Sequence, residues 1–195
     1  MTRIHPQENA CSNDTSAAGS QATALTRTIP TVLVLMGVAG SGKTTVADIL
    51  VSGLGWRFQE GDALHPQSNV EKMRSGHPLT DGDRAEWLKR VADWVEDRLQ
   101  NGQNGIITCS ALKRSYRDLI NRRGSGVVFV FLSGPKSTIA QRLASRQGHF
   151  MPSNLLDSQL GDLEGPGPDE PAIQVDITGT PDAIAQRIVA ELDLD

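Results

Sequence analysis

The sequence predicts a doubly wound α/β domain, and two patterns carry that prediction. Short apolar runs alternate along the chain with segments in which apolar residues recur every three or four positions, as strands and amphipathic helices do. The run VVFVFL at 127–132 is apolar throughout and rich in β-branched valine, which is typical of a parallel strand covered on both faces. We therefore expect a parallel sheet with helices packed on both sides.

The expected elements follow one another in regular order. The strand candidates are residues 31–36, 56–58, 105–109, 127–132 and 173–177. Helical patterns cover residues 46–54, 87–99 and 112–120, an arginine-bearing helix follows the fourth strand, and Thr180-Pro181 begins a last helix with a capping residue and a proline. Residues 147–171 break the alternation because they are rich in glycine and proline. A long irregular insert in a compact domain is typical of a functional lid, which we place at about residues 145–171.

Composition favours one domain in a reducing compartment. The 195 residues are enough to bury a core without disulfides, and a net charge of −4 gives no support for nucleic-acid or membrane binding. No apolar run approaches the roughly 20 residues that span a bilayer. Residues 1–29 have almost no bulky apolar side chains, so we expect a disordered tail ahead of a domain at 30–195. Cys11 lies in that tail and Cys109 in an apolar strand, where a buried thiol is expected; this usage fits the cytoplasm.

A phosphate-binding motif follows the first strand. Residues 37–44, GVAGSGKT, match G-x-x-x-x-G-K-[ST] and lie between a buried strand and a helix, the context that the motif requires. The glycines allow backbone N–H groups to turn toward phosphate oxygens at the helix N-terminus. Lys43 is expected to reach the β- and γ-phosphates of ATP, and the Thr44 hydroxyl to ligate Mg²⁺. The predicted nucleotide contacts are Gly37, Val38, Ala39, Gly40, Ser41, Gly42, Lys43, Thr44 and Thr45.

A second polar stretch, EGDALHPQSN at 60–69, follows the second strand. Ligands of open α/β sheets bind beyond the carboxyl ends of the strands, so we expect Asp62 near the γ-phosphate. A carboxylate in that position can accept the proton of an attacking hydroxyl. Gly61-Asp62 is also a favourable turn, and position alone leaves both interpretations open.

Taken together, the motifs resemble those of the gluconokinase family, small P-loop carbohydrate kinases related to shikimate and nucleoside monophosphate kinases. The blocks that carry the resemblance are LMGVAGSGKTT (35–45), EGDALHPQSNVEKMRSGHPLTDGDRAEWL (60–88), CSALKRSYRDLI (109–120), FLSG (131–134) and RLASRQGHFMPSNLLDSQLGDLEGPGPDE (142–170). The first block is generic to P-loop proteins, whereas the second and third are far more specific. The resemblance implies a P-loop NTPase fold, a three-layer α/β/α sandwich with a five-stranded parallel sheet, like the nucleoside monophosphate kinases, and a lid insert.

The resemblance also implies an activity. The γ-phosphoryl group of ATP, used with Mg²⁺, is transferred to the 6-hydroxyl of D-gluconate to give 6-phospho-D-gluconate and ADP, feeding gluconate into the pentose phosphate or Entner–Doudoroff routes. Asp62 is then the expected base or orienter of the attacking hydroxyl, and His65 shapes the polyol site. Arg84, Lys113 and Arg117 are candidates to hold the substrate carboxylate, since arginine can form a bidentate pair with it. A homodimer is expected from the resemblance alone.

Structural roles remain open for several of these residues. Arg84 follows two aspartates at a helix start and is also suited to tie down that turn. Lys113 and Arg117 lie four apart, as on a solvated helix face. His65 precedes a proline and also fits a loop-packing role. Trp87 lies on an apolar stripe, so we expect it in the core rather than stacked on a base.

The predicted lid contributes two arginines. Arg142 and Arg146 lie four apart where a helix enters the insert. Closing such a segment would bring guanidinium charge onto the transferring phosphoryl group and exclude water. Arg146 is therefore a catalytic candidate and Arg142 a nucleotide contact, with a surface helix as the alternative.

Two departures from the family pattern stand out. Glu60 replaces a frequent aspartate, which bears on a Mg²⁺-bound water, and Leu160-Gly161 follow Ser-Gln where an aromatic residue is usual, which bears on lid stability.

Three other functions fit part of the sequence. A shikimate kinase needs an arginine and glycine arrangement after the third strand, where this chain has CSALK at 109–113. A nucleotide kinase needs arginines grouped for an acceptor phosphate, whereas residues 60–84 offer aspartate, histidine and asparagine suited to hydroxyls. A non-catalytic ATP-binding regulatory module is the alternative from a different class, and we see no extra partner domain that would favour it.

Overall fold

The computed structural model describes residues 1, 29–145 and 153–194. One sheet contains the strands β1 (Val32–Met36), β2 (Arg57–Glu60), β3 (Gly105–Thr108), β4 (Val127–Ser133) and β5 (Ala172–Asp176). All four pairings are parallel, and the strand order is β2-β3-β1-β4-β5. The predicted five-stranded parallel sheet is therefore confirmed.

Seven α-helices are described around this sheet. They are α1 (Lys43–Leu54), α2 (Gln67–Arg74), α3 (Asp81–Gln100), α4 (Arg114–Ile120), α5 (Lys136–Ala144), α6 (Ser153–Asp162) and α7 (Pro181–Leu192), and a short 3-10 helix, η1 (Gly61–Leu64), follows β2. The predicted helices are confirmed as α1, α3, α4, α5 and α7, and Thr180 caps α7 as expected. None of the described helices is long and apolar enough for a membrane span.

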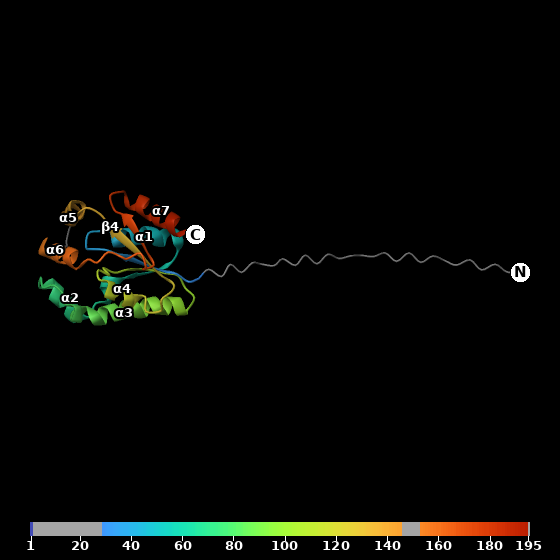
Figure 1. Ribbon diagram of the computed structural model, residues 1–195, viewed down its shortest axis with the longest axis horizontal. Helices are drawn as coiled ribbons and strands as arrows, with labels where there is room; N and C mark the ends of the chain where they lie inside the picture. The colour runs from blue at the N-terminus through green and yellow to red at the C-terminus, as the bar shows by residue number, and fades with distance from the viewer. Residues whose placement is uncertain (2–28, 146–152, 195) are drawn as a thin grey trace.

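The sheet lies between two helical layers (Figure 1), with α1 and α7 on one face and α3 and α4 on the other. All five residues of β1 are fully buried. Leu33 and Leu35 face the layer of α1 and α7, whereas Val32, Val34 and Met36 face α3 and α4. Burial on both faces explains why the central strands read as continuous apolar runs rather than as alternating ones.

The predicted lid is more regular than its composition indicated. We expected residues 147–171 to be irregular, but α6 occupies ten of them, and Leu156 on α6 is 4% exposed in the core shared with α1 and α7. The glycines and prolines of this range cluster after Gly161, so composition averaged over the whole range concealed the helix in its first half. The expected tail and the start of the lid, residues 2–28 and 146–152, lie outside the described residues.

Helix α2 was not predicted, because its stabilising contacts are polar. Asn69 is 4% exposed and donates from Nδ2 to the backbone oxygen of Asp83 at 2.7 Å. Lys72 pairs with the Asp83 carboxylate at 2.6 Å. The same carboxylate accepts from the Thr80 backbone N–H at the start of α3, which closes a capping box. A single aspartate therefore joins α2 to the beginning of α3.

The end of β2 passes unusually close to β3. Gly61 N donates to Thr108 Oγ1 at 3.1 Å, and a Cβ atom built on Gly61 would lie 1.8 Å from the Thr108 backbone oxygen. The indole Nε1 of Trp87 donates to Gly61 O at 2.8 Å and holds this junction from below. Only glycine fits at the point where the chain leaves β2 and enters η1.

We predict that Gly61→Ala strongly destabilises the fold, because its methyl group must displace strand backbone. Overpacking of this kind costs about 3 kcal/mol, which corresponds to a melting temperature roughly 6–12 °C lower for a domain of this size. Thermal unfolding followed by circular dichroism measures the shift. Gly53→Ala is the matched control: a Cβ atom there meets nothing within 4 Å, so it should leave stability unchanged or raise it slightly. Equal melting temperatures for both variants would contradict the proposed clash.

Candidate active site

The turn between β1 and α1 forms a cradle for phosphate. Gly37, Gly40 and Gly42 have positive φ, the left-handed region that suits glycine, and a Cβ atom on Gly37 would lie 2.7 Å from the Leu132 backbone oxygen. Helix α1 has no acidic residue in its first turn and no side-chain cap. Its first N–H groups are therefore available to an anion, and the helix dipole favours negative charge there.

Two side chains of the cradle complete this arrangement. Lys43 Nζ donates to the backbone oxygens of Gly37 and Val38, at 3.0 and 3.1 Å, which holds the ammonium group at the turn. Ser41 is fully buried, and its Oγ has no hydrogen-bond partner among the described residues. A buried hydroxyl without a partner calls for an explanation, and a ligand rich in oxygen atoms would supply one.

Oxygen atoms from the first turn of α1 and from the ends of β2 and β3 meet beside the cradle. Thr44 Oγ1 donates to Glu60 Oε2 at 2.7 Å, and Thr108 Oγ1 donates to the other oxygen of the same carboxylate. Mg²⁺ prefers such oxygen donors and binds one or two carboxylates together with water and phosphate. Thr44 Oγ1 and the Glu60 carboxylate are oxygen donors of this kind and lie within hydrogen-bond distance of each other.

Asp62 lies in η1, directly beyond β2, and Cys109 directly follows β3. Burial raises the pKa of Cys109 to about 12; the charges of Asp62 and Glu60 also raise this pKa, whereas that of Lys43 lowers it. The expectation that Cys109 is a buried thiol is confirmed. Asp62 follows Gly61, which donates to Thr108 at the end of β3, and the Gly37 N–H of the cradle donates to Ser110 O just beyond β3 at 3.2 Å. The predicted base and the cradle therefore both lie at the end of β3.

His65 packs against the core next to Asp62. Its ring stacks on Trp87 with 4.2 Å between centroids and 15° between planes. Trp87 is 2% exposed, which confirms that it belongs to the core. Burial lowers the pKa of His65, the Asp62 charge raises it, and the Arg84 charge lowers it. The imidazole is therefore neutral at pH 7, and it lies close enough to Asp62 and Arg84 to sense both.

Arg84 and Lys113 form a cationic pair next to this polar group. Lys113 Nζ donates to both oxygens of Asp81, at 3.0 and 2.9 Å. Arg84 Nη1 lies 3.5 Å from Asp81 and 3.4 Å from Asp162 on α6, and donates to the Tyr116 hydroxyl at 3.1 Å. The structure thus brings two of the three predicted carboxylate-binding residues together. Arg84 also contacts Asp81 at the start of α3, as expected for the alternative role in which it ties down that turn.

Arg117, the third of these residues, is placed differently from our expectation. Its side chain is 1% exposed and makes two hydrogen bonds to Glu170, at 2.5 and 2.9 Å. The remaining Nη1 group donates to backbone oxygens of Ala111, at 3.1 Å, and Glu164, at 2.8 Å. Arg117 is therefore neither on a solvated face nor open to a ligand. It holds Ala111, whose φ of 44° is strained for a non-glycine residue, and so fixes the turn that leads to Lys113.

The predicted nucleotide arginine lies over the cradle. Arg142 at the end of α5 donates from Nη2 to the Ile177 backbone oxygen at 2.6 Å, and its Nη1 would lie 3.5 Å from a Cβ atom on Gly42. Its position agrees with a nucleotide contact. Arg146, the predicted catalytic arginine of the lid, lies outside the described residues.

Three polar contacts of the site were missed from the sequence. The Tyr116 hydroxyl donates to Asp81 at 2.5 Å, although Tyr116 reads as part of an apolar stripe. Asp162 contacts Arg84 across 78 residues. The Gln159 side chain accepts from the Ala39 backbone N–H of the cradle at 2.7 Å, across 120 residues. Each contact joins separate elements, so no local pattern could have indicated it.

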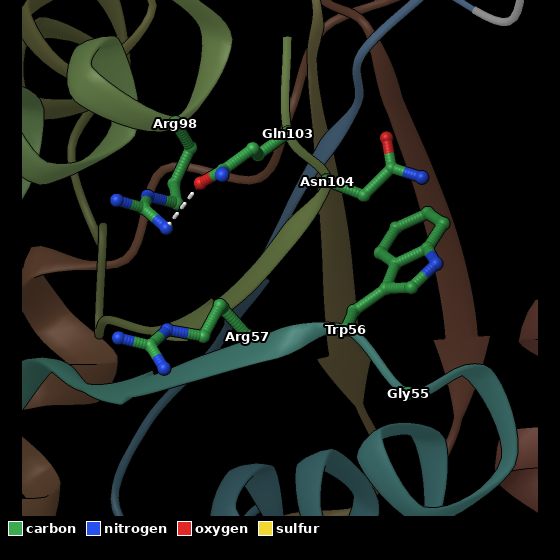
Figure 2. A pocket seen from close by; sticks show the side chains of 6 residues that line it. All are labelled: Gly55, Trp56, Arg57, Arg98, Gln103 and Asn104. Atoms are coloured by element: carbon green, nitrogen blue, oxygen red, sulfur yellow. Dashed lines mark hydrogen bonds between the residues drawn. The ribbon is translucent and has the colours of Figure 1, made fainter. Parts of the chain in front are cut away.

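A hollow of about 430 Å³ lies at the opposite edge of the sheet and is not this site. It is lined by Gly55, Trp56, Arg57, Arg98, Gln103 and Asn104. These residues lie at the starts of β2 and β3 and at the end of α3, and Figure 2 shows Arg98 turned toward Gln103, to which it donates at 2.6 Å. Parallel α/β sheets bind ligands at the carboxyl ends of the strands, and the cradle and the other polar groups described above lie at those ends.

A parallel α/β/α sandwich with a glycine-rich cradle, its lysine and a carboxylate across from it defines a P-loop kinase. A family profile described as an AAA domain matches residues 32–166. A curated gluconokinase from Gluconobacter oxydans is 51% identical over 160 residues, which cover 82% of this chain and 90% of that protein. The chain belongs to the gluconokinase family.

Solved structures agree with this assignment. A gluconokinase from Sinorhizobium meliloti is 43% identical with a TM-score of 0.76, over 85% of this chain and 93% of that one. An unliganded sugar kinase from Janibacter sp. HTCC2649 is 44% identical with a TM-score of 0.78, over 85% and 95%. Shikimate kinase from Aquifex aeolicus, at 18% identity and a TM-score of 0.53 over 83% and 96%, shows the shared fold alone.

We predict that Glu170→Gln destabilises the protein by about 3–5 kcal/mol at pH 7, because the buried Arg117 loses its counter-charge. The Arg117 hydrogen bonds lower the pKa of Glu170 from its ordinary 4.5. A lowered carboxylate pKa contributes stability above the unfolded-state pKa and loses it as the pH falls through the folded-state pKa. The difference between wild type and variant should therefore shrink below pH 4.5. Denaturant unfolding between pH 3 and 8 measures it.

Asp169→Asn provides the control for this experiment. Asp169 pairs with Arg114 at 2.7 Å, but both side chains are about half exposed or more, at 61% and 48%, and water screens such a pair. Its loss should change stability far less than the loss of Glu170. Equal effects of the two substitutions would contradict the structural role assigned to Arg117 and Glu170.

Proposed function

We propose that the protein is an ATP-dependent gluconokinase, which phosphorylates D-gluconate at the 6-hydroxyl and releases 6-phospho-D-gluconate and ADP. The observation that carries this proposal is that α6, which contacts the phosphate cradle through Gln159, also contacts Arg84 and Lys113, in a chain whose relatives are named gluconokinases. Two cations suit one carboxylate. The nearby Asp62 and His65 supply acceptors for the hydroxyls of a polyol.

The proposed step is a direct phosphoryl transfer. The 6-hydroxyl oxygen forms a bond to the γ-phosphorus of ATP, the bond from that phosphorus to the bridging oxygen breaks, and ADP leaves with the electron pair. Asp62 accepts the hydroxyl proton or orients the hydroxyl for attack. The cradle N–H groups, Lys43 and Arg142 hold the phosphates and stabilise their charge. Arg146 is proposed to join them from the lid.

We propose Thr44 and Glu60 as the residues that hold Mg²⁺. When bound, the ion would neutralise phosphate charge and help to hold the β- and γ-phosphates in line. The hydroxyl groups of Thr44 and Thr108 each donate to the Glu60 carboxylate and hold it in place. The longer glutamate side chain therefore lies beside Thr44, in a position that suits a metal ligand. This explains how glutamate can serve where many family members have aspartate.

The competing functions are less well supported. The likeness to shikimate kinase at 18% identity concerns the fold alone. A nucleotide acceptor would need arginines grouped for its phosphate, whereas among the described residues of the acceptor side Arg84 is accompanied by a lysine, Lys113, and Arg117 is buried against Glu170. A purely regulatory module would not need a carboxylate at the end of β2 facing the cradle.

The assembly and the compartment are further proposals. The family resemblance supports a homodimer acting in the cytoplasm, with a kinase domain at residues 30–195 and a tail before it. Light scattering coupled to size-exclusion chromatography tests the dimer, because the chain mass of 21.0 kDa separates a monomer from a dimer clearly.

We predict that ADP release from MgATP depends on D-gluconate and is absent with shikimate, AMP or buffer alone. A coupled ADP assay with mass determination of the product checks the acceptor and the number of phosphoryl groups added. Turnover with another acceptor would keep the kinase and refute the substrate. Tight ATP binding with no acceptor-dependent turnover would favour the regulatory module.

We predict that Asp62→Asn lowers kcat with gluconate about 10²- to 10⁴-fold, the usual contribution of a positioned general base. The affinity for a non-hydrolysable ATP analogue should be unchanged, because Asp62 is not part of the phosphate cradle. Calorimetric titration and initial rates measure the two quantities. Asp118→Asn, on the exposed side of α4, is the charge-matched control. A kcat within a few-fold of the wild-type value would show that Asp62 is not the base or orienter of the attacking hydroxyl.

A further inference from the structure

One turn of α6 contacts both halves of the active site. Gln159 Oε1 accepts from the Ala39 N–H of the cradle at 2.7 Å. Three residues further on, Asp162 lies 3.4 Å from Arg84 Nη1 and 4.0 Å from Lys113 Nζ. Residues three apart lie on neighbouring parts of one helix surface, so a single helix face touches the nucleotide side and the acceptor side together.

Each contact places an oxygen atom where a ligand oxygen would be recognised. The Gln159 side-chain oxygen accepts the hydrogen bond from Ala39 N–H that a phosphate oxygen would accept in a nucleotide complex. The Asp162 carboxylate stands for the carboxylate of a sugar acid between two cations. These side chains are only partly exposed, at 13% for Arg84, 24% for Lys113 and 32% for Asp162. Both cations also contact Asp81, so a substrate carboxylate that pairs with them competes with Asp162 for the remaining donors.

Helix α6 is fixed well enough to act as one body. Leu156 is 4% exposed in the core, and Leu160 packs partly buried against the same core. In Figure 1, α6 lies at the end of the molecule where α5 and α2 also lie. Movement of either Gln159 or Asp162 away from its partner therefore shifts the other residue with it.

We propose that Asp162 and Gln159 set the affinity for the acceptor and the nucleotide, by occupying both sites until ligands displace them. This inference rests on the proposed function for the identity of the acceptor. Each ligand that binds shifts the end of α6 that carries Gln159 and Asp162, while Leu156 keeps the helix in the core, and the second ligand then meets less competition. Nucleotide and gluconate consequently tighten one another's binding, and linkage requires the factor to be equal in both directions.

The test compares binding in wild type and Asp162→Asn. Titration calorimetry measures the dissociation constants of D-gluconate and of a non-hydrolysable ATP analogue, each alone and with the other at saturation. In wild type each ligand should strengthen the other. In Asp162→Asn, gluconate alone should bind about two- to fivefold more tightly, the size expected for a partly exposed ion pair, and the mutual factor should fall.

Asp157→Asn is a matched control on the same helix. Asp157 pairs with Lys136 on α5 at 2.6 Å, and both side chains are about 60% exposed. The substitution removes the same charge and one ion pair from α6 without touching either ligand site. Gluconate affinity should remain at the wild-type value. If both variants changed affinity equally, the effect would be one of overall charge, and the proposal would fail.

Two results would overturn the inference. Weaker gluconate binding in Asp162→Asn would make Asp162 a substrate contact, and independent binding of the two ligands to wild type would remove the coupling. If wild type bound no gluconate at all, the proposed function would fail instead. The nucleotide half then remains testable, because Gln159→Ala should bind the ATP analogue about two- to tenfold more tightly; weaker binding would refute the displacement.

Discussion

The candidate active site depends on five parallel strands whose carboxyl ends lie at one edge of the sheet. Parallel pairing places the carboxyl ends of β1, β2 and β3 side by side, although they are far apart in sequence. Thr44, Glu60 and Thr108 consequently meet in one chain of hydrogen bonds. The close approach of Gly61 to β3 brings Asp62 to the same edge. The cradle, the candidate metal ligands and the candidate base all depend on this pairing.

Buried charge extends this arrangement to the acceptor side. The Arg117–Glu170 pair ties the strained turn at Ala111 to the segment that follows α6. Breaking such a pair is costly because one charge remains buried without a partner. Lys113 is the N-cap of α4, only two residues after that turn, so a structural ion pair determines where a candidate ligand-binding cation lies. Structural and functional arginines here lie on neighbouring elements and differ chiefly in exposure.

The sequence was sufficient for the sheet and the cradle, because both depend on local patterns. Continuous apolar runs predicted the strands, and residues 37–44 predicted the turn with its lysine. For the acceptor side, the sequence indicated which residue types occur but not which contacts they make. Arg84 and Lys113 lie together, and their role in binding the substrate remains a prediction. Arg117 is buried, which the sequence did not reveal because the same arginine pattern fits a surface, a site or an internal ion pair. Gln159 and Asp162 could not be foreseen, because their partners lie 120 and 78 residues away.

The stacking of His65 on Trp87 gives the protein an optical property. An indole ring lies 4.2 Å from an imidazole that borders the proposed acceptor pocket, and its emission depends on whether that imidazole is neutral or charged. Because burial lowers the pKa of His65 below its ordinary 6.5, the imidazole is neutral at pH 7 and no charged ring is stacked on Trp87. Of the three tryptophans in the sequence, Trp87 is the one that lies against this imidazole, so its emission would report a change in the surroundings of His65 without any added label.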